Sequence, residues 1–151
     1  MAANPTALER TGVVMIADQL LTLVQHAPPC TFAISTTSRT HGYSGATNLV
    51  ILTTPLGCPW NVVNTNDWVT ITSPANGSGN ATISYTVETN PDTFNRTGVV
   101  MIADQSLTLR QLAAPCAYVL SPTYSTYGFD GGTGLVSMAT SANCPWAVTN
   151  T

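Results

Sequence analysis

The sequence predicts an all-β protein, a β-sandwich repeat with one complete unit flanked by two partial units. The segment RTGVVMIADQ occurs at 10–19 and again at 96–105, an offset of 86 residues, and a fixed period of this kind indicates a repeat array. Apolar residues alternate with a period of two, as in half-buried strands. Stretches rich in Gly, Asn and Pro interrupt the alternation at short intervals, which is typical of sandwiches.

The repeat divides the chain into three parts. Residues 4–29 correspond to the C-terminal hairpin of a preceding unit, 30–115 to a complete unit, and 116–151 to the N-terminal part of a following unit. A unit of this length can bury a modest core. Each partial unit lacks strands, so we expect its core face to stay open unless something else covers it.

Seven strands are expected in the complete unit, each one an apolar or alternating run between turn-forming residues. In chain order they are 31–35, 47–53, 60–63, 68–72, 81–88, 98–103 and 107–111. The last two strands are expected to be separated by Asp104 and Gln105, and this turn is short enough for a hairpin.

The alternation also predicts which side chains face the core. In strand 81–88 the inward residues are Ile83, Tyr85 and Val87. In the final strand one face carries Leu107, Leu109 and Gln111.

Composition excludes several partners. Charged residues make up 7% of the chain, lysine is absent, and the net charge is −3, against about 25% charged residues in an ordinary domain. Without a basic patch nothing neutralises phosphates, so we expect no nucleic-acid binding. No apolar stretch reaches 18 residues, so we expect no membrane insertion.

The four cysteines form two copies of one spacing, Cys30 to Cys58 and Cys116 to Cys144. None lies in a CxxC pair and neither histidine has ligand-like spacing to them, so we expect no metal site. A disulfide within each unit, contributing about 3.6 kcal/mol in the chain-entropy model, places the protein outside the cell or on its surface. The first residues are not typical of a signal peptide, so we expect a processed chain or a fragment.

A series of motifs resembles a BACON-type repeat, the Bacteroidetes-associated carbohydrate-binding often N-terminal domain. The resemblance covers the middle unit and both partial ones. It implies an immunoglobulin-like sandwich in secreted or surface proteins, often in tandem, with carbohydrate binding but no catalytic residues. The matching residues are Cys30, Cys58, Trp60, Trp68, Gly77, Gly79, Tyr85, Asn90, Arg96, Gly98 and Gln111.

Aromatic side chains are the candidates for stacking on a sugar. Trp60 and Trp146 each follow a cysteine by two residues, which favours packing in the core. Tyr43, in a Gly-rich loop, and Trp68, at the head of a short strand, are the possible glycan contacts, although a core position is also favoured for Trp68.

No catalytic or cofactor site is expected. The acids of the complete unit are predicted at turns or strand ends, which gives no carboxylate pair for glycoside hydrolysis. His41 has no visible Ser or Asp partner, and the glycine-rich run at 77–79 lacks the lysine of a phosphate loop. Arg96 is expected to make a structural hydrogen bond or salt link at the edge of the sandwich. Gln111 is expected to satisfy backbone groups where one unit joins the next, rather than to bind a ligand.

The N-terminal copy of the last strand differs from the internal copy on its outward face. Ser106 is replaced by Leu20, and Arg110 by Val24, so this strand is apolar on both faces, as a strand buried on both faces is. We therefore expect head-to-tail assembly into a surface filament, in which the N-terminal hairpin of one molecule completes the C-terminal part of the next. The donor residues are Val13, Val14, Ile16, Leu20, Leu21, Leu23 and Val24.

That assembly has a difficulty and two alternatives. Residues 4–29 and 116–151 together contain no counterpart of 66–89, so the joined unit would lack two of its expected strands. The alternatives are a carbohydrate-binding module or a spacer repeat of a secreted adhesin.

Overall fold

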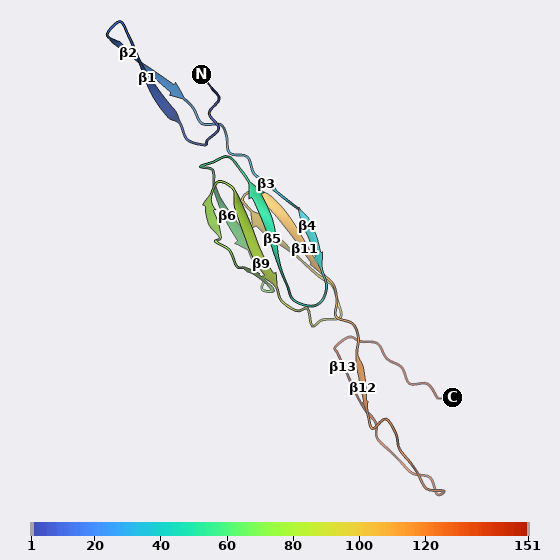
Figure 1. Ribbon diagram of the computed structural model, residues 1–151. Coiled ribbons are helices and arrows are strands. Elements are labelled where there is room, and N and C mark those ends of the chain that lie inside the picture. The colour runs from blue at the N-terminus through green and yellow to red at the C-terminus, as the bar shows by residue number, and fades with distance from the viewer. Residues whose placement is uncertain (1, 151) are drawn as a thin grey trace.

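The computed structural model describes residues 2–150, and in that range it contains thirteen strands and no helix. The strands form a central β-sandwich with a two-stranded hairpin on either side of it in the sequence. These three parts lie end to end, and the molecule is long and thin (Figure 1). Strands β3 to β11, which build the sandwich, all lie within the range 30–115 that the repeat predicts for a complete unit.

One sheet of the sandwich has five strands in the order β4-β11-β10-β6-β8. Only β4 and β11 are parallel, and the other neighbours in this sheet are antiparallel. Its strands are β4 (Ser38–His41), β6 (Pro59–Asn64), β8 (Asn76–Ser78), β10 (Arg96–Ile102) and β11 (Gln105–Gln111).

The other sheet has four strands in the order β3-β5-β9-β7, all antiparallel. They are β3 (Ala33–Ile34), β5 (Ala46–Thr53), β7 (Val69–Ile71) and β9 (Ala81–Val87). The two sheets enclose one core because each presents every second side chain inward. Its buried members include Val50, Leu52, Ile83, Tyr85, Val100, Ile102, Leu107 and Leu109.

The alternation identified the core correctly, and the turn-based boundaries were less accurate. Ile83, Tyr85 and Val87 are buried, as are Leu107, Leu109 and Gln111. The turn between β10 and β11 comprises residues 103–104, one position earlier than expected, and the backbone of Ala103 is left-handed with φ of 52°.

Two strands were missed. Strand β4 is polar and lies in a segment that was expected to be a loop, and it forms because it pairs in parallel with β11. Strand β8 falls in a stretch rich in Asn, Gly and Ser that predicts a turn, but it pairs with β6. Both are short edge strands whose formation depends on a neighbouring strand rather than on their own composition.

The N-terminal hairpin has the same register as the one that closes the sandwich. Strands β1 (Arg10–Ile16) and β2 (Gln19–Gln25) pair residue for residue like β10 and β11 at the 86-residue offset. Val14 is nevertheless 42% exposed where its counterpart Val100 is 1% exposed. The hairpin keeps its local geometry while its core face remains uncovered by the described residues.

The C-terminal part contains one hairpin, β12 (Tyr118–Ser121) with β13 (Ser137–Thr140). Both disulfides are formed, Cys30–Cys58 and Cys116–Cys144, each with a Cα–Cα distance of 5.6 Å. Within residues 2–150 there is no helix long and apolar enough to cross a membrane.

Gly98 on β10 lies beneath packed side chains, and this generates a stability prediction. A Cβ at Gly98 would overlap Asn66 Oδ1 and would lie 2.9 Å from Trp68 Cζ2, whereas nothing lies within 4 Å of a Cβ at Gly12. We expect Gly98→Ala to destabilise the chain by about 1–3 kcal/mol through overpacking, measured by urea unfolding.

Gly12→Ala is the matched control, because Gly12 occupies the same place in an identical stretch of sequence. We expect it to leave the unfolding midpoint of the sandwich unchanged. Equal effects of the two substitutions would contradict the packing that we describe around Gly98.

Candidate functional site

A buried amide fixes the loops at the end of the sandwich where β11 ends. The Gln111 side chain is fully buried. Its Nε2 donates to the carbonyl oxygens of Glu88 at 2.8 Å and Tyr43 at 3.2 Å. Its Oε1 accepts from Arg96 Nε at 2.8 Å. One side chain thereby links the loop at 42–45 to the end of β9, which satisfies the structural role expected for Gln111.

Arg96 continues this network and covers Trp68. Its Nη2 donates to the carbonyls of Glu88 and Thr89 at 2.9 and 3.1 Å. The guanidinium lies 4.6 Å from the centroid of the Trp68 ring, a cation–π contact. Trp68 is only 8% exposed. Its ring face is therefore not free for stacking on a sugar, and the core role is the one that the structure shows.

Asn90 joins three loops at the same end of the sandwich. It is fully buried, its backbone N–H donates to Tyr43 O at 2.7 Å, and its Nδ2 donates to Phe94 O and Leu112 O, both at 2.9 Å. Because buried amides of this kind hold backbone in place, the loops at 42–45, 89–95 and 111–113 form a fixed platform, which we call the Asn90 platform.

The Asn90 platform carries exposed apolar side chains. Tyr43 is 44% exposed, Phe94 62% and Leu112 40%. Aromatic side chains on an ordered backbone, with polar backbone groups nearby, are the usual components of a small-ligand contact surface. Of the two glycan-contact candidates, Tyr43 is thus accessible and Trp68 is not. Phe94 and Leu112 escaped notice in the sequence because neither belongs to a motif.

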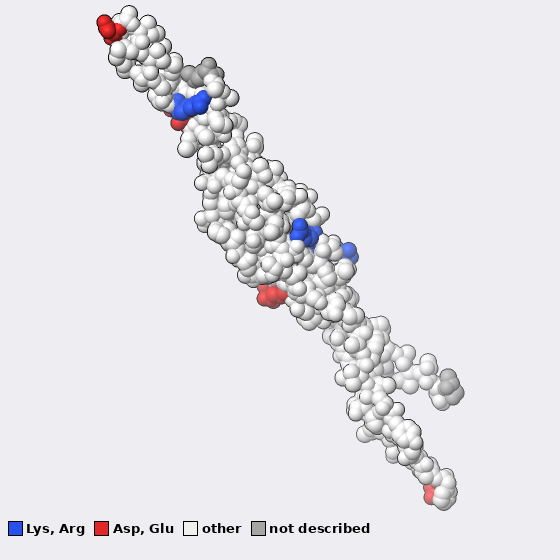
Figure 2. Space-filling view, in the orientation of Figure 1, with Lys and Arg blue, Asp and Glu red and all other residues white. Residues whose placement is uncertain are grey.

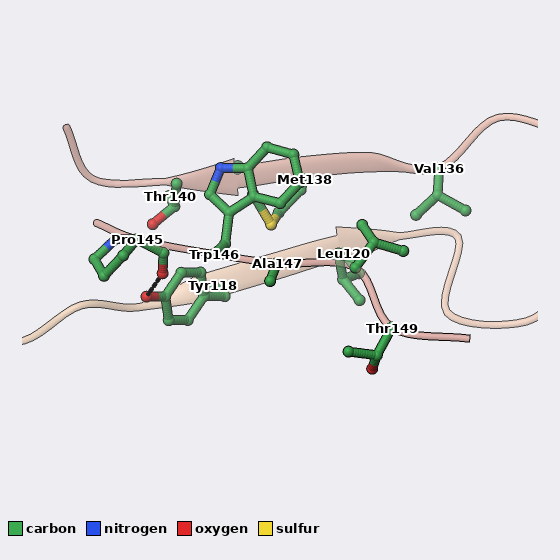
Figure 3. A pocket seen from close by; sticks show the side chains of 11 residues that line it. Tyr118, Leu120, Val136, Met138, Thr140, Pro145, Trp146, Ala147 and Thr149 are labelled. Atoms are coloured by element: carbon green, nitrogen blue, oxygen red, sulfur yellow. Dashed lines mark hydrogen bonds between the residues drawn. The ribbon is translucent and has the colours of Figure 1, made fainter. Parts of the chain in front are cut away.

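The remaining tryptophans have different surroundings. Trp60 belongs to the core, and its Nε1 donates to Gly79 O at 2.8 Å. Trp146, its counterpart, is 61% exposed and lines an open apolar groove with Leu120, Val136 and Met138 (Figure 3). At the 86-residue offset Val136 corresponds to Val50, Met138 to Leu52 and Trp146 to Trp60, so the groove corresponds to the inside of a sandwich that the described residues leave incomplete.

Two titratable side chains, His41 and Tyr85, lie next to each other inside the sandwich. His41 is 5% exposed, and its Nε2 lies 3.3 Å from the hydroxyl oxygen of Tyr85. Burial, and secondarily the positive charge of Arg39, lowers the pKa of His41. Burial raises the pKa of Tyr85. The pair is therefore a neutral hydrogen bond within the core.

The structure brings no catalytic or metal-binding set together in residues 2–150. Asp67, Glu88, Asp92 and Asp104 are all exposed. No group of three or more His, Cys, Asp or Glu side chains in that range is arranged to hold a metal ion.

Comparison with known proteins gives a family model that matches part of the chain and a solved structure with a similar fold. Residues 59–112 match the family model BACON, described as "Putative binding domain, N-terminal". No curated protein matches the chain. Among solved structures, the chain is similar to a Bacteroides ovatus GH5 xyloglucanase in complex with a XXXG heptasaccharide, with a TM-score of 0.50 and 16% identity. The match covers 56% of this chain and 19% of the xyloglucanase chain. At this identity it shows a shared fold, and it confirms the sandwich.

The buried histidine makes stability depend on pH. Because the folded pKa of His41 lies below its usual 6.5, the unfolded chain takes up the proton more readily. We therefore expect stability to fall as the pH drops below about 6.5 towards the lowered value. Urea unfolding at several pH values measures this loss. In His41→Gln, which keeps a polar partner for Tyr85, the loss over this window should be smaller, and an equal loss in both proteins would contradict the assignment to His41.

Proposed function

Because residues 59–112 carry a BACON domain, we propose that this chain is a non-catalytic repeat module of a secreted protein that acts on or attaches to carbohydrate. The Asn90 platform is the observation that supports a binding role, because it presents Tyr43 on a backbone fixed by two buried amides. Two disulfides support an oxidising, extracellular location.

The fold comparison supports the association with carbohydrate. The solved chain of which a portion shares this fold is named a xyloglucanase and is in complex with a XXXG heptasaccharide, and the matched portion is 19% of it. A non-catalytic module in a protein that acts on or attaches to carbohydrate either contacts the carbohydrate or serves as a spacer. The exposed Tyr43 favours contact, and the elongated shape favours spacing (Figure 1).

Polysaccharide binding is tested by affinity electrophoresis and calorimetry with xyloglucan as the first probe, followed by a panel of other neutral polysaccharides. We expect weak binding that Tyr43→Ala reduces about tenfold, equivalent to roughly 1.4 kcal/mol. Phe129→Ala is the matched control, because Phe129 is the counterpart of Tyr43 in the C-terminal part and is fully exposed. Absence of binding to every probe would contradict contact and leave the spacer role.

Strand complementation is the second candidate, and one observation favours it. The β1–β2 hairpin has the register of β10–β11, yet Val14, Ile16 and Leu21 on its core face are 42–58% exposed. Leu20 and Val24, on its other face, are also exposed. An apolar hairpin of this kind suits insertion beside the strands of a second copy of the chain.

The pairing of strands within the sandwich supports a position for such a hairpin. In the complete unit β11 pairs with β4 and β10 pairs with β6. The counterparts of β4 and β6 are residues 124–127 and 145–150, and residues 145–149 line the groove of Figure 3. Both segments are present in the C-terminal part, although neither is a strand there, whereas the counterparts of β7, β8 and β9 are not found in residues 116–151.

Assembly is tested by sedimentation and electron microscopy of the purified chain. We expect concentration-dependent polymers that deletion of residues 4–25 abolishes, because the donor strands are removed. The double variant Leu20→Ser, Val24→Arg, which copies β11, should weaken assembly less. A chain that stays monomeric at about 100 μM, roughly a hundredfold above a Kd of 1 μM, would contradict strand complementation.

A further inference from the structure

We propose that each unit of this chain is an interaction partner of the next, through a repeated joint that a disulfide locks. This goes beyond the proposed function, because it concerns the surfaces between units and requires no ligand. The structure contains two such joints, one on each side of the sandwich, and their contacts correspond at the 86-residue offset.

The first correspondence is between the loops that touch. At the first joint the Ala7 N–H donates to Leu56 O at 2.7 Å, next to a bridge between Thr6 and Leu56. At the second joint Thr93 Oγ1 donates to Ala142 O at 3.1 Å. Residues 7 and 93 are equivalent, as are 56 and 142. The same two loops therefore meet at both joints, although the donor is a backbone amide in one and a hydroxyl in the other.

The receiving loops also have the same shape. In each, a cysteine N–H donates to the carbonyl three residues earlier, Cys58 to Pro55 at 3.2 Å and Cys144 to Ser141 at 3.3 Å. The residue before each cysteine is left-handed, Gly57 with φ of 90° and Asn143 with φ of 64°. Glycine and asparagine are the residues that adopt this conformation most readily.

The third correspondence ties the touching loop to the linker that leaves the unit. Asn90 Nδ2 donates to Phe94 O and to Leu112 O, both at 2.9 Å. Asn4 Nδ2 makes the equivalent bonds to Leu8 O at 2.7 Å and His26 O at 3.3 Å. At the second joint the linker is bonded further, because Ala114 N–H donates to Asp92 O at 2.8 Å.

The disulfide closes a ring around the joint. Cys116 follows the bonded Leu112 after only three residues, 113–115, and is bridged to Cys144, which lies two residues beyond Ala142. The path from Asn90 through Thr93, across to Ala142, through the disulfide and back along the linker is therefore continuous. Cys30–Cys58 takes the same position at the first joint. A short linker that is fixed at both ends leaves little freedom for one unit to turn relative to the next.

Nuclear spin relaxation of backbone amides in the full oxidised chain tests this joint. We expect amides of β10–β11 and of β12–β13 to share one overall tumbling time, because the two parts move as one rod. In the double variant Cys116→Ser, Cys144→Ser, the tumbling time of β12–β13 should shorten by about twofold or more relative to β10–β11. That disulfide lies outside the sandwich, so β10–β11 should keep its chemical shifts.

A second variant guards against loss of structure in the C-terminal part. Thr93→Val removes the donor to Ala142 and keeps both the disulfide and the shape of the side chain, and it should loosen β12–β13 to a smaller extent. Thr70→Val, at an exposed position on β7, is the matched control and should change nothing. Unequal tumbling in the oxidised chain, or equal tumbling in both joint variants, would overturn the proposal. If the cysteine variant unfolds β12–β13, the result with Thr93→Val decides alone.

Discussion

The structure depends on one constraint, which is that the apolar inner face of a sheet is buried only when a second sheet covers it. In the sandwich the inner face of β10–β11 lies against the inner face of β5–β9, and Val100, Leu107, Val50 and Ile83 are each at most 1% exposed. Burying each such side chain contributes about 1.5–3 kcal/mol. The same constraint applies to the two outer parts. The apolar inner face of each outer hairpin is exposed, because no second sheet in the described residues covers it.

This constraint explains why the same repeated segment is buried in one copy and exposed in the other. RTGVVMI forms β1 and β10 with the same pairing, so local sequence is sufficient for the hairpin. Burial is different, because it depends on strands that are far away along the chain. Ile102 is fully buried and Ile16 is 58% exposed, although their neighbours in sequence are the same. Formation of the hairpin is decided by local sequence, whereas formation of the core requires the strands of the whole unit.

Much of the fold could be predicted from the sequence, and the candidate site could be predicted only in part. Alternation is a strong signal where strands are long and half buried, as in β5, β9 and β10. It fails for β4 and β8, whose pairing is decided by neighbours. Tyr43 was a candidate because of its Gly-rich loop, and a core position was already favoured for Trp68, but the position of Arg96 over the Trp68 ring could not be predicted from the sequence. The Asn90 platform also depends on contacts between residues 22 and 47 positions apart, which no local pattern reveals.

The joints have a consequence for the length of the protein. Figure 2 shows a slender outline with few charged atoms on the visible face. Electrostatic attraction and repulsion between neighbouring units are therefore weak. Because the contacts are the same at each joint, the distance from one end of the molecule to the other depends on the number of units. Gain or loss of an 86-residue segment would lengthen or shorten the molecule by one fixed step and would leave the surfaces at both ends as they were. The number of 86-residue repeats thus sets the length of the molecule.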